Sequence, residues 1–181
     1  ALAGTAGLVR GADRFAGVTA RMQEFVDKGE AAGVVTLVAT KDRILHLGVV
    51  GKTDMAKDRK MRTDDIFWIA AMSKPITAVC VAILADDGKL RFDDPLSKYL
   101  PEFAPASMTL REVMTHTSGL GDMMNRPPHL TLDETSKLLA KQPLRFQPGS
   151  RWAYSTAGID ILGRVVEVVS GMPFDQFLQK R

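Results

Sequence analysis

The chain has 181 residues, of which 45% are hydrophobic and 25% are charged. That is enough apolar material for one domain with a packed core, and too much for a disordered chain. The 24 Lys and Arg residues exceed the 21 Asp and Glu residues by three, with both signs mixed along the sequence, which argues against a dedicated nucleic-acid-binding protein. No apolar run approaches the roughly 18 residues of a transmembrane helix, so we expect neither a nucleic-acid partner nor a membrane partner.

The cysteine and histidine content limits which disulfides and metal sites the chain can form. The single cysteine, Cys80, excludes an internal disulfide and a cysteine zinc site. His46, His116 and His129 lack the paired spacing of metal ligands, so no metal ion is expected. The first residues carry neither an initiator Met nor a signal-peptide pattern, which suggests a processed or trimmed start.

The first elements in the chain are predicted to be a helix and a hairpin. Apolar residues recur at spacings of three and four within residues 13–29, namely Phe15, Val18, Met22, Phe25 and Val26. Two β-branched, apolar runs at 34–40 and 44–50 flank a short polar turn and indicate antiparallel strands. An isolated two-stranded sheet is marginal, so further strands are expected from elsewhere.

A second helix is predicted to follow residue 70. Ile76, Val79, Cys80 and Ile83 make it apolar over most of its circumference, so we expect it to be buried. Pro75 falls in its first turn, where the missing N–H is harmless, and Gly88 is a natural stop.

The remaining sequence is predicted to be helical. Residues 93–150 contain seven of the nine prolines and two capping-box spacings, beginning at Thr109 and Thr131, and show no strand pattern. A last helix is predicted from Ala157 to Val169, with Thr156 as its N-cap and Gly171 as its stop. This organisation divides the chain into an N-terminal α/β part (1–92), a helical region (93–150) and a loop with its following helix (151–181).

Four stretches, at 66–77, 94–101, 114–120 and 146–158, read IFWIAAMSKPIT, DPLSKYLP, MTHTSGL and FQPGSRWAYSTAG. In this order and spacing they resemble the serine β-lactamase-like superfamily, in particular class C β-lactamase-related esterases (family VIII carboxylesterases) and their D-aminopeptidase and DD-peptidase relatives. The resemblance runs from about residue 15 to residue 181. It implies an α/β fold of the β-lactamase/transpeptidase type, in which an antiparallel sheet is flanked by helices and a helical region covers the cleft. It also implies a serine acyl-transfer reaction without an organic cofactor.

The first motif of this superfamily is Ser-x-x-Lys at the start of a buried helix. A serine in the first helical turn lies near the positive end of the helix dipole, and a lysine three residues later shares its face. Such a lysine, packed among apolar groups, can act as the base that activates the serine. Here Lys74 is present, but the nucleophile position is Ala71, while Ser73 is adjacent to the lysine and points away from it. Ala71 indicates either an engineered inactive variant, which we favour, or a natural pseudoenzyme.

The second motif, Tyr-x-Asn, is matched by Tyr154 with Thr156 in place of Asn. The resemblance implies that Tyr154 is a general base and that Thr156 binds the substrate carbonyl. Because Thr is shorter than Asn, the substitution weakens the case for β-lactam amides and leaves esters plausible. The resemblance assigns His116 a structural role at a helix end, and we expect no Ser-His-Asp triad.

The third motif, Lys-Thr-Gly or His-x-Gly on a later strand, is missing before the chain ends at Gln179, Lys180 and Arg181. We therefore expect this chain to be the N-terminal part only, completed by a C-terminal fragment or a second chain.

The expected substrate is a small acyl ester or lactam. The function predicted is a carboxylesterase that works through an acyl-enzyme. A β-lactamase or DD-peptidase type of amide hydrolase and a non-catalytic binding homologue remain as alternatives. The resemblance is compatible with a bacterial cytoplasmic, periplasmic or secreted protein.

Overall fold

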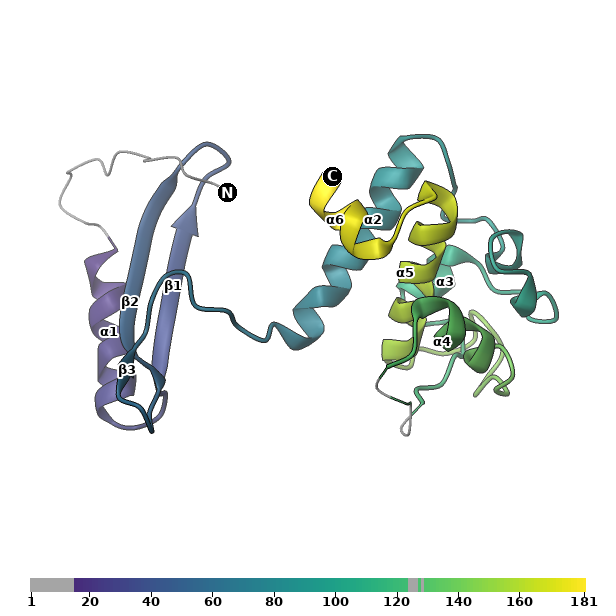
Figure 1. Cartoon of the computed structure of the whole chain (residues 1–181). Coiled ribbons are helices and arrows are strands. Elements are labelled where there is room, and N and C mark those ends of the chain that lie inside the picture. The colour runs from purple at the N-terminus through teal and green to yellow at the C-terminus, as the bar shows by residue number, and fades with distance from the viewer. Residues whose placement is uncertain (1–14, 124–126, 128) are drawn as a thin grey trace. The chain divides into compact units, whose positions relative to one another are not determined.

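The computed structural model describes residues 15–123, 127 and 129–181. The chain divides into two compact units, Ala1–Trp68 and Ile69–Arg181. Figure 1 shows that the described strands belong to the first unit and that the second unit is built from helices and loops.

The first unit consists of one helix and a small antiparallel sheet. Helix α1 (Ala16–Asp27) precedes strands β1 (Gly33–Ala39) and β2 (Ile44–Asp54) and the short strand β3 (Arg59–Lys60). The strand order is β1-β2-β3, and the β1–β2 register pairs Val34 with Val50 and Leu37 with Leu47. The predicted helix and hairpin are therefore confirmed, and β3 is an addition that the sequence patterns do not reveal.

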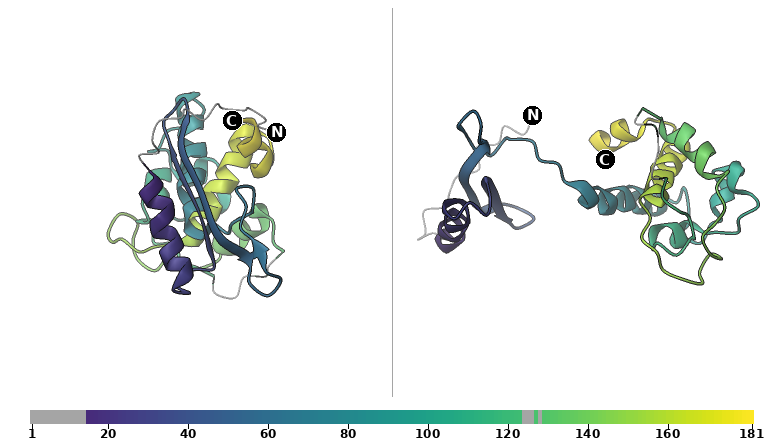
Figure 2. Two further views of the ribbon diagram at one scale, coloured as in Figure 1. Left: turned by 90° about the vertical axis from the view of Figure 1, so that its left-hand side faces the viewer. Right: turned by 90° about the horizontal axis from the view of Figure 1, so that it is seen from below.

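Helix α1 covers one face of the hairpin and packs mainly against β2 (Figure 2). Gly48 permits this approach, because a Cβ there would lie 2.5 Å from the Thr19 hydroxyl oxygen of α1. The side chain of His46 points into the same face, where its Nε2 lies 3.1 Å from the Thr36 hydroxyl. Within this unit the opposite face keeps Leu37 59% exposed and Leu47 46% exposed.

The second unit packs its helices around α5. Its long helices are α2 (Ser73–Asp86) and α5 (Thr156–Ser170), accompanied by the 3₁₀ turns η1 (Ala70–Met72), η2 (Leu96–Lys98) and η3 (Pro101–Phe103) and by the shorter helices α3 (Leu110–Met114), α4 (Leu132–Leu139) and α6 (Phe174–Lys180). Helix α5 contacts α2, α3, α4 and α6, and its buried face is formed by Ile161, Leu162, Val165 and Val166. Apolar residues of α2 and of the loop 90–110, among them Leu84, Leu96 and Met108, complete this core.

The helix termini follow the capping signals in the sequence with one correction. Both predicted capping boxes form, at Thr109 with Glu112 and at Thr131 with Glu134. Gly171 ends α5 in the left-handed conformation, as predicted. The N-cap of α5 is Ser155 rather than Thr156, because the Ser155 hydroxyl accepts the Gly158 N–H, and Thr156 is the first helical residue.

Within the second unit, helix α2 buries one face. Thr77, Cys80, Val81 and Leu84 face the core, as the apolar pattern predicts. Within this unit Ile76 is 43% exposed and Val79 is 56% exposed, so the expected burial of this helix is met on its core face and not at these two positions. None of the helices in the described part of the chain is long and apolar enough to cross a bilayer.

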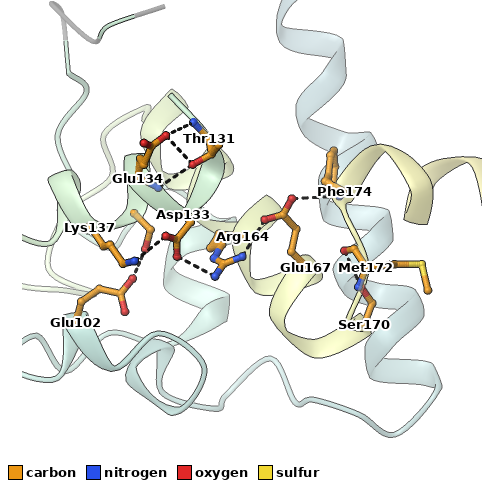
Figure 3. A network of polar contacts seen from close by, with 11 residues as sticks. Glu102, Thr131, Asp133, Glu134, Lys137, Arg164, Glu167, Ser170, Met172 and Phe174 are labelled. Carbon is orange, nitrogen blue, oxygen red and sulfur yellow. Dashed lines mark hydrogen bonds and ion pairs between the residues drawn. The ribbon is translucent and has the colours of Figure 1, made fainter. Parts of the chain in front are cut away.

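A half-buried arginine ties α4 to α5 (Figure 3). Arg164 of α5 donates from Nη2 to Asp133 of α4 at 2.8 Å and from Nη1 to Glu167 at 3.1 Å. Glu167 in turn accepts the backbone N–H of Phe174, the first residue of α6, at 3.2 Å. These charge-assisted bonds fix three helices against one another.

The second sequence stretch, 94–101, forms a tight turn centred on one carboxylate. Asp94 accepts hydrogen bonds from the Tyr99 hydroxyl, from Lys98 Nζ at 2.9 Å and from the Arg91 backbone N–H at 2.8 Å. These donors, with the Tyr99 hydroxyl contributing most, lower the pKa of Asp94 from 3.8 to about 2. Burial is the main cause of the raised pKa of Tyr99, and its bond to Asp94 adds to it.

Candidate active site

Residue 71 lies in the 3₁₀ turn η1, immediately before α2 rather than within it. Its methyl group is exposed and offers no nucleophile. The preceding residue, Ala70, has φ of 45°, a left-handed conformation that costs an alanine about 1 to 2 kcal/mol. Strain of this kind persists only where the surrounding structure enforces it, and it is common at functional sites.

Ser73 and Lys74 diverge, as expected for adjacent helical residues. The Ser73 hydroxyl donates to the Ala70 carbonyl oxygen at 2.8 Å and so closes the η1 turn. Lys74 is half-buried, and no carboxylate in the described parts of the chain pairs with it. Ser73 is therefore engaged in local structure, whereas the Lys74 amine is available to other partners.

The side chains of Lys74 and Tyr154 are in contact, although they come from different elements. The Lys74 Nζ lies 5.0 Å from the centroid of the Tyr154 ring, within the range of a cation–π contact. Tyr154 is 43% exposed and lies two residues before α5, and Thr156 is exposed at the first position of that helix. The structure thus brings together Lys74 and Tyr154 from stretches 80 residues apart in the sequence, and it places Ala71 in the turn that leads into the lysine helix.

The imidazole of His116 contacts the ring of Tyr154. Its ring centroid is 4.8 Å from that of Tyr154 with the planes tilted by 37°, and it makes an edge contact with Trp152 at 6.1 Å. Its Nδ1 accepts the backbone N–H of Ser155 at 3.3 Å. Burial lowers the pKa of His116, and the charge of Lys74 lowers it further, while Asp122 acts in the opposite direction.

Asp122 holds the start of α5. Its carboxylate accepts the Ala157 backbone N–H at 2.9 Å and the Ser155 hydroxyl at 3.4 Å. A carboxylate at a helix N-terminus satisfies otherwise unpaired N–H groups and complements the helix dipole. The sequence analysis missed Asp122, because its partners lie more than 30 residues away and leave no local pattern.

The segment 116–122 supports the loop 145–157 along its length. The Gly119 carbonyl accepts the Arg145 N–H and the Thr117 carbonyl accepts the Gly149 N–H, both at 2.8 Å. Gly119 has φ of 81°, and a Cβ at this position would lie 2.2 Å from the Phe146 carbonyl oxygen. Glycine is therefore required where the two segments touch.

Other groups that could take part in catalysis or bind a metal ion lie away from Lys74 and Tyr154. Cys80 is buried in the core face of α2, where burial raises the pKa of its thiol. In the described residues, no group of three or more His, Cys, Asp and Glu side chains is arranged to hold a metal ion. A surface pocket lined by Phe103, Leu120, Leu139 and Leu144 contains none of the four predicted site residues.

Known proteins resemble this chain over most of its length. The Beta-lactamase family model matches residues 18–181. Esterase EstB of Burkholderia gladioli is 35% identical over 87% of this chain, and Penicillin-binding protein 4* of Bacillus subtilis is 31% identical over 84%. The solved structure of EstCE1, a hydrolase with promiscuous acyltransferase activity, superposes with a TM-score of 0.80 at 30% identity over 90% of this chain.

These relatives are longer than this chain, which covers 47% of EstB, 36% of Penicillin-binding protein 4* and 49% of EstCE1. The fold is of the β-lactamase/transpeptidase type, as the sequence motifs predict. The small antiparallel sheet and the helices described above make up the part of that fold that this chain spans. The chain belongs to the Beta-lactamase family of serine hydrolases, which includes esterases and penicillin-binding proteins.

Proposed function

We propose that this chain carries the nucleophile position and the proton-transfer residues of a serine hydrolase for small acyl esters. The observation that carries the proposal is the contact of Lys74 Nζ with the Tyr154 ring, in a site where residue 71 precedes the lysine by three positions. Lysine and tyrosine are both established general bases. Ala71 makes the present form inactive, because the side chain has no oxygen to attack a carbonyl.

The reaction follows from a serine at position 71. Its oxygen attacks the ester carbonyl carbon, and its proton passes to the Lys74–Tyr154 pair. The backbone N–H of residue 71 serves as one oxyanion donor, and a second comes from a strand outside this chain. The pair returns the proton to the departing alcohol, and an acyl-enzyme ester remains on residue 71. Water then attacks this ester and gives up a proton to the pair, which passes that proton to the departing serine oxygen, so that the acid and the free serine are released.

Further strands complete the site in this proposal. The support is the small size of the sheet, which has three strands in the described residues, together with the greater length of the relatives. A C-terminal fragment or second chain would supply these strands and the third motif. We use "completed protein" for this chain together with the segment or second polypeptide that supplies the remaining strands.

Two alternatives have specific support. Amide hydrolysis of the β-lactamase or DD-peptidase type is favoured by the similarity to Penicillin-binding protein 4*. Thr156 favours esters, since a threonine hydroxyl reaches less far toward a substrate amide than asparagine does. A non-catalytic binding protein is favoured by Ala71 alone, if alanine is the natural residue.

The deciding experiment restores the nucleophile in the completed protein. With Ala71→Ser, we expect hydrolysis of p-nitrophenyl acetate and butyrate to rise by several orders of magnitude, with much slower turnover of the β-lactam nitrocefin. The matched control is Ser73→Ala in the same background, which removes the neighbouring hydroxyl and its bond to the Ala70 carbonyl oxygen and should lower turnover far less than loss of the residue 71 hydroxyl does. Faster turnover of nitrocefin than of the esters would establish the amide alternative, and no turnover of either class would favour the binding protein.

A further inference from the structure

We propose that His116, as a neutral imidazole, is the residue that positions Tyr154 for proton transfer beside Lys74. The inference rests on the function proposed above. His116 makes its side-chain contacts with residues 152–155, so it acts through the tyrosine and is not itself a base for residue 71.

His116 holds the chain on both sides of Tyr154. Its carbonyl oxygen accepts the Ala153 N–H at 2.9 Å, and its Nδ1 accepts the Ser155 N–H at 3.3 Å. Between these two bonds, the imidazole lies against the Tyr154 ring, with 4.8 Å between the ring centroids and 37° between the ring planes. One residue thus fixes the backbone before and after the tyrosine as well as the plane of its ring.

The backbone of His116 is adapted to this arrangement. Its φ of 61° is left-handed, which is uncommon for a residue other than glycine but is found more often for His, Asn and Asp. This conformation lets the carbonyl oxygen and the side chain of His116 engage the same loop. Uncommon backbone conformations that survive at a site point to a local function.

The proposal requires the uncharged imidazole. Because Nδ1 accepts the Ser155 N–H, the single proton of the neutral ring is on Nε2. Protonation would add a hydrogen at Nδ1, break this bond and place a second positive charge near Lys74. The groups that face the ring are Lys74 from α2, Tyr154 from the loop and Asp122 from the supporting segment, and burial together with Lys74 favours the neutral form.

The pH dependence has a defined sign. The pKa of His116 is lower than that of an ordinary histidine. The imidazole is therefore neutral at neutral pH and takes up a proton at a lower pH than an ordinary histidine does. Turnover should therefore fall on the acid side as His116 takes up a proton. This decrease in turnover at acid pH, the acid limb of the pH profile, should disappear when His116 is replaced by a side chain that does not titrate.

The test uses two substitutions that both tolerate left-handed backbone, in the Ala71→Ser completed protein. His116→Asn keeps a side-chain acceptor, whereas His116→Gly removes both the acceptor and the ring. Since misplacing a catalytic group by about 1 Å can cost on the order of a hundredfold, we expect His116→Gly to lower kcat by about that factor with little change in KM. His116→Asn should restore most of kcat and lack the acid limb. His129→Asn, at an exposed loop position, is the control that should change neither.

A second measurement is independent of catalysis. In ¹⁵N-labelled completed protein, the His116 ring should show the Nε2–H tautomer at neutral pH, and exchange of the Ser155 amide should accelerate as the ring is protonated. An Nδ1–H tautomer or an unprotected Ser155 amide would overturn the proposal. Unchanged kcat in His116→Gly, or an acid limb that persists in His116→Asn, would also overturn it. If the Ala71→Ser protein shows no turnover, the proposed function fails, and the ring tautomer and Ser155 exchange still decide whether His116 holds the tyrosine loop.

Discussion

The amine of Lys74 lies 5.0 Å from the centre of the Tyr154 ring, although the two residues come from different elements and are 80 positions apart. Lys74 belongs to the first turn of α2, and Tyr154 belongs to the loop that leads into α5. These two helices pack directly on each other. The site geometry is therefore set by the central helix pair of the second unit.

Loss of either proposed proton-transfer group should reduce turnover more than substrate affinity. In the Ala71→Ser completed protein, we expect Lys74→Ala and Tyr154→Phe each to lower kcat by about a hundredfold or more, because in the proposed reaction both groups act on protons in the transition state. Steady-state kinetics with p-nitrophenyl butyrate measure this split. The control is Tyr99→Phe, the other tyrosine, which should lower stability and leave kcat in place. A tenfold rise in KM with unchanged kcat would assign Lys74 and Tyr154 to binding instead.

Two glycines with the same backbone conformation should differ in their tolerance of a methyl group. Gly119 and Gly88 have φ of 81° and 72°, but a Cβ at Gly119 meets the Phe146 carbonyl oxygen, whereas a Cβ at Gly88 meets nothing within 4 Å. We expect Gly88→Ala to lower the free energy of unfolding by about 1 kcal/mol through backbone strain alone. Gly119→Ala should cost about 3 kcal/mol or more, since steric overlap is added to the strain. Equal costs in urea unfolding would show that the contact between 119 and 146 is not tight.

The Asp94 turn should make the second unit sensitive to acid. The pKa of Asp94 is about 2 in the folded chain against its usual 3.8, so the folded state favours the carboxylate. The resulting stabilisation is complete above the unfolded value and is lost as the pH falls from about 3.8 toward 2. Urea midpoints measured at pH 7 and pH 3 should therefore differ less in Asp94→Asn than in the unaltered protein. Asp42→Asn, in an exposed turn of the first unit, is the control and should leave the difference unchanged. An equal pH effect in Asp94→Asn would contradict the assignment.

The small size of the sheet predicts how residues 1–181 behave when expressed alone. In the described residues the sheet has three strands, in the order β1-β2-β3, and this chain spans about half the length of EstB and EstCE1. A sheet that lacks partner strands leaves backbone edges and apolar groups without cover. We expect the isolated chain to bind the dye 8-anilinonaphthalene-1-sulfonate and to unfold without a sharp transition. The completed protein should not bind the dye and should unfold in one sharp transition. A soluble isolated monomer with a sharp cooperative transition would show that no further strands are needed.

Local sequence signals predicted most of the elements. The spacing of Phe15, Val18 and Met22 identified α1, and the β-branched runs identified β1 and β2. The capping boxes at Thr109 and Thr131 were predictable because Thr and Glu three residues apart satisfy each other's N–H groups within one turn. Each of these features depends on residues that are close in sequence.

Features set by distant contacts were not predictable in the same way. Ser155 rather than Thr156 caps α5, since the position of the helix start is fixed by Asp122 and His116 from another segment. The η1 turn and the left-handed Ala70 leave no signal in a sequence that reads as continuous helix. The exposure of Ile76 could not be inferred either, because hydropathy reports which residues favour burial and not which surface covers them.

The central claim is that residue 71 occupies the nucleophile position, and covalent labelling tests it most directly. The completed protein with Ala71→Ser is treated with a fluorophosphonate ester, and the labelled residue is located by peptide mass mapping. A serine activated by Lys74 and Tyr154 should displace fluoride and carry one phosphonyl group, whereas the Ala71 protein should carry none. The label should persist in the Ser73→Ala variant of the Ala71→Ser protein and be lost in the Lys74→Ala variant. Labelling of Ser73 or Ser155 in place of residue 71, or equal labelling of the Ala71 protein, would contradict the assignment.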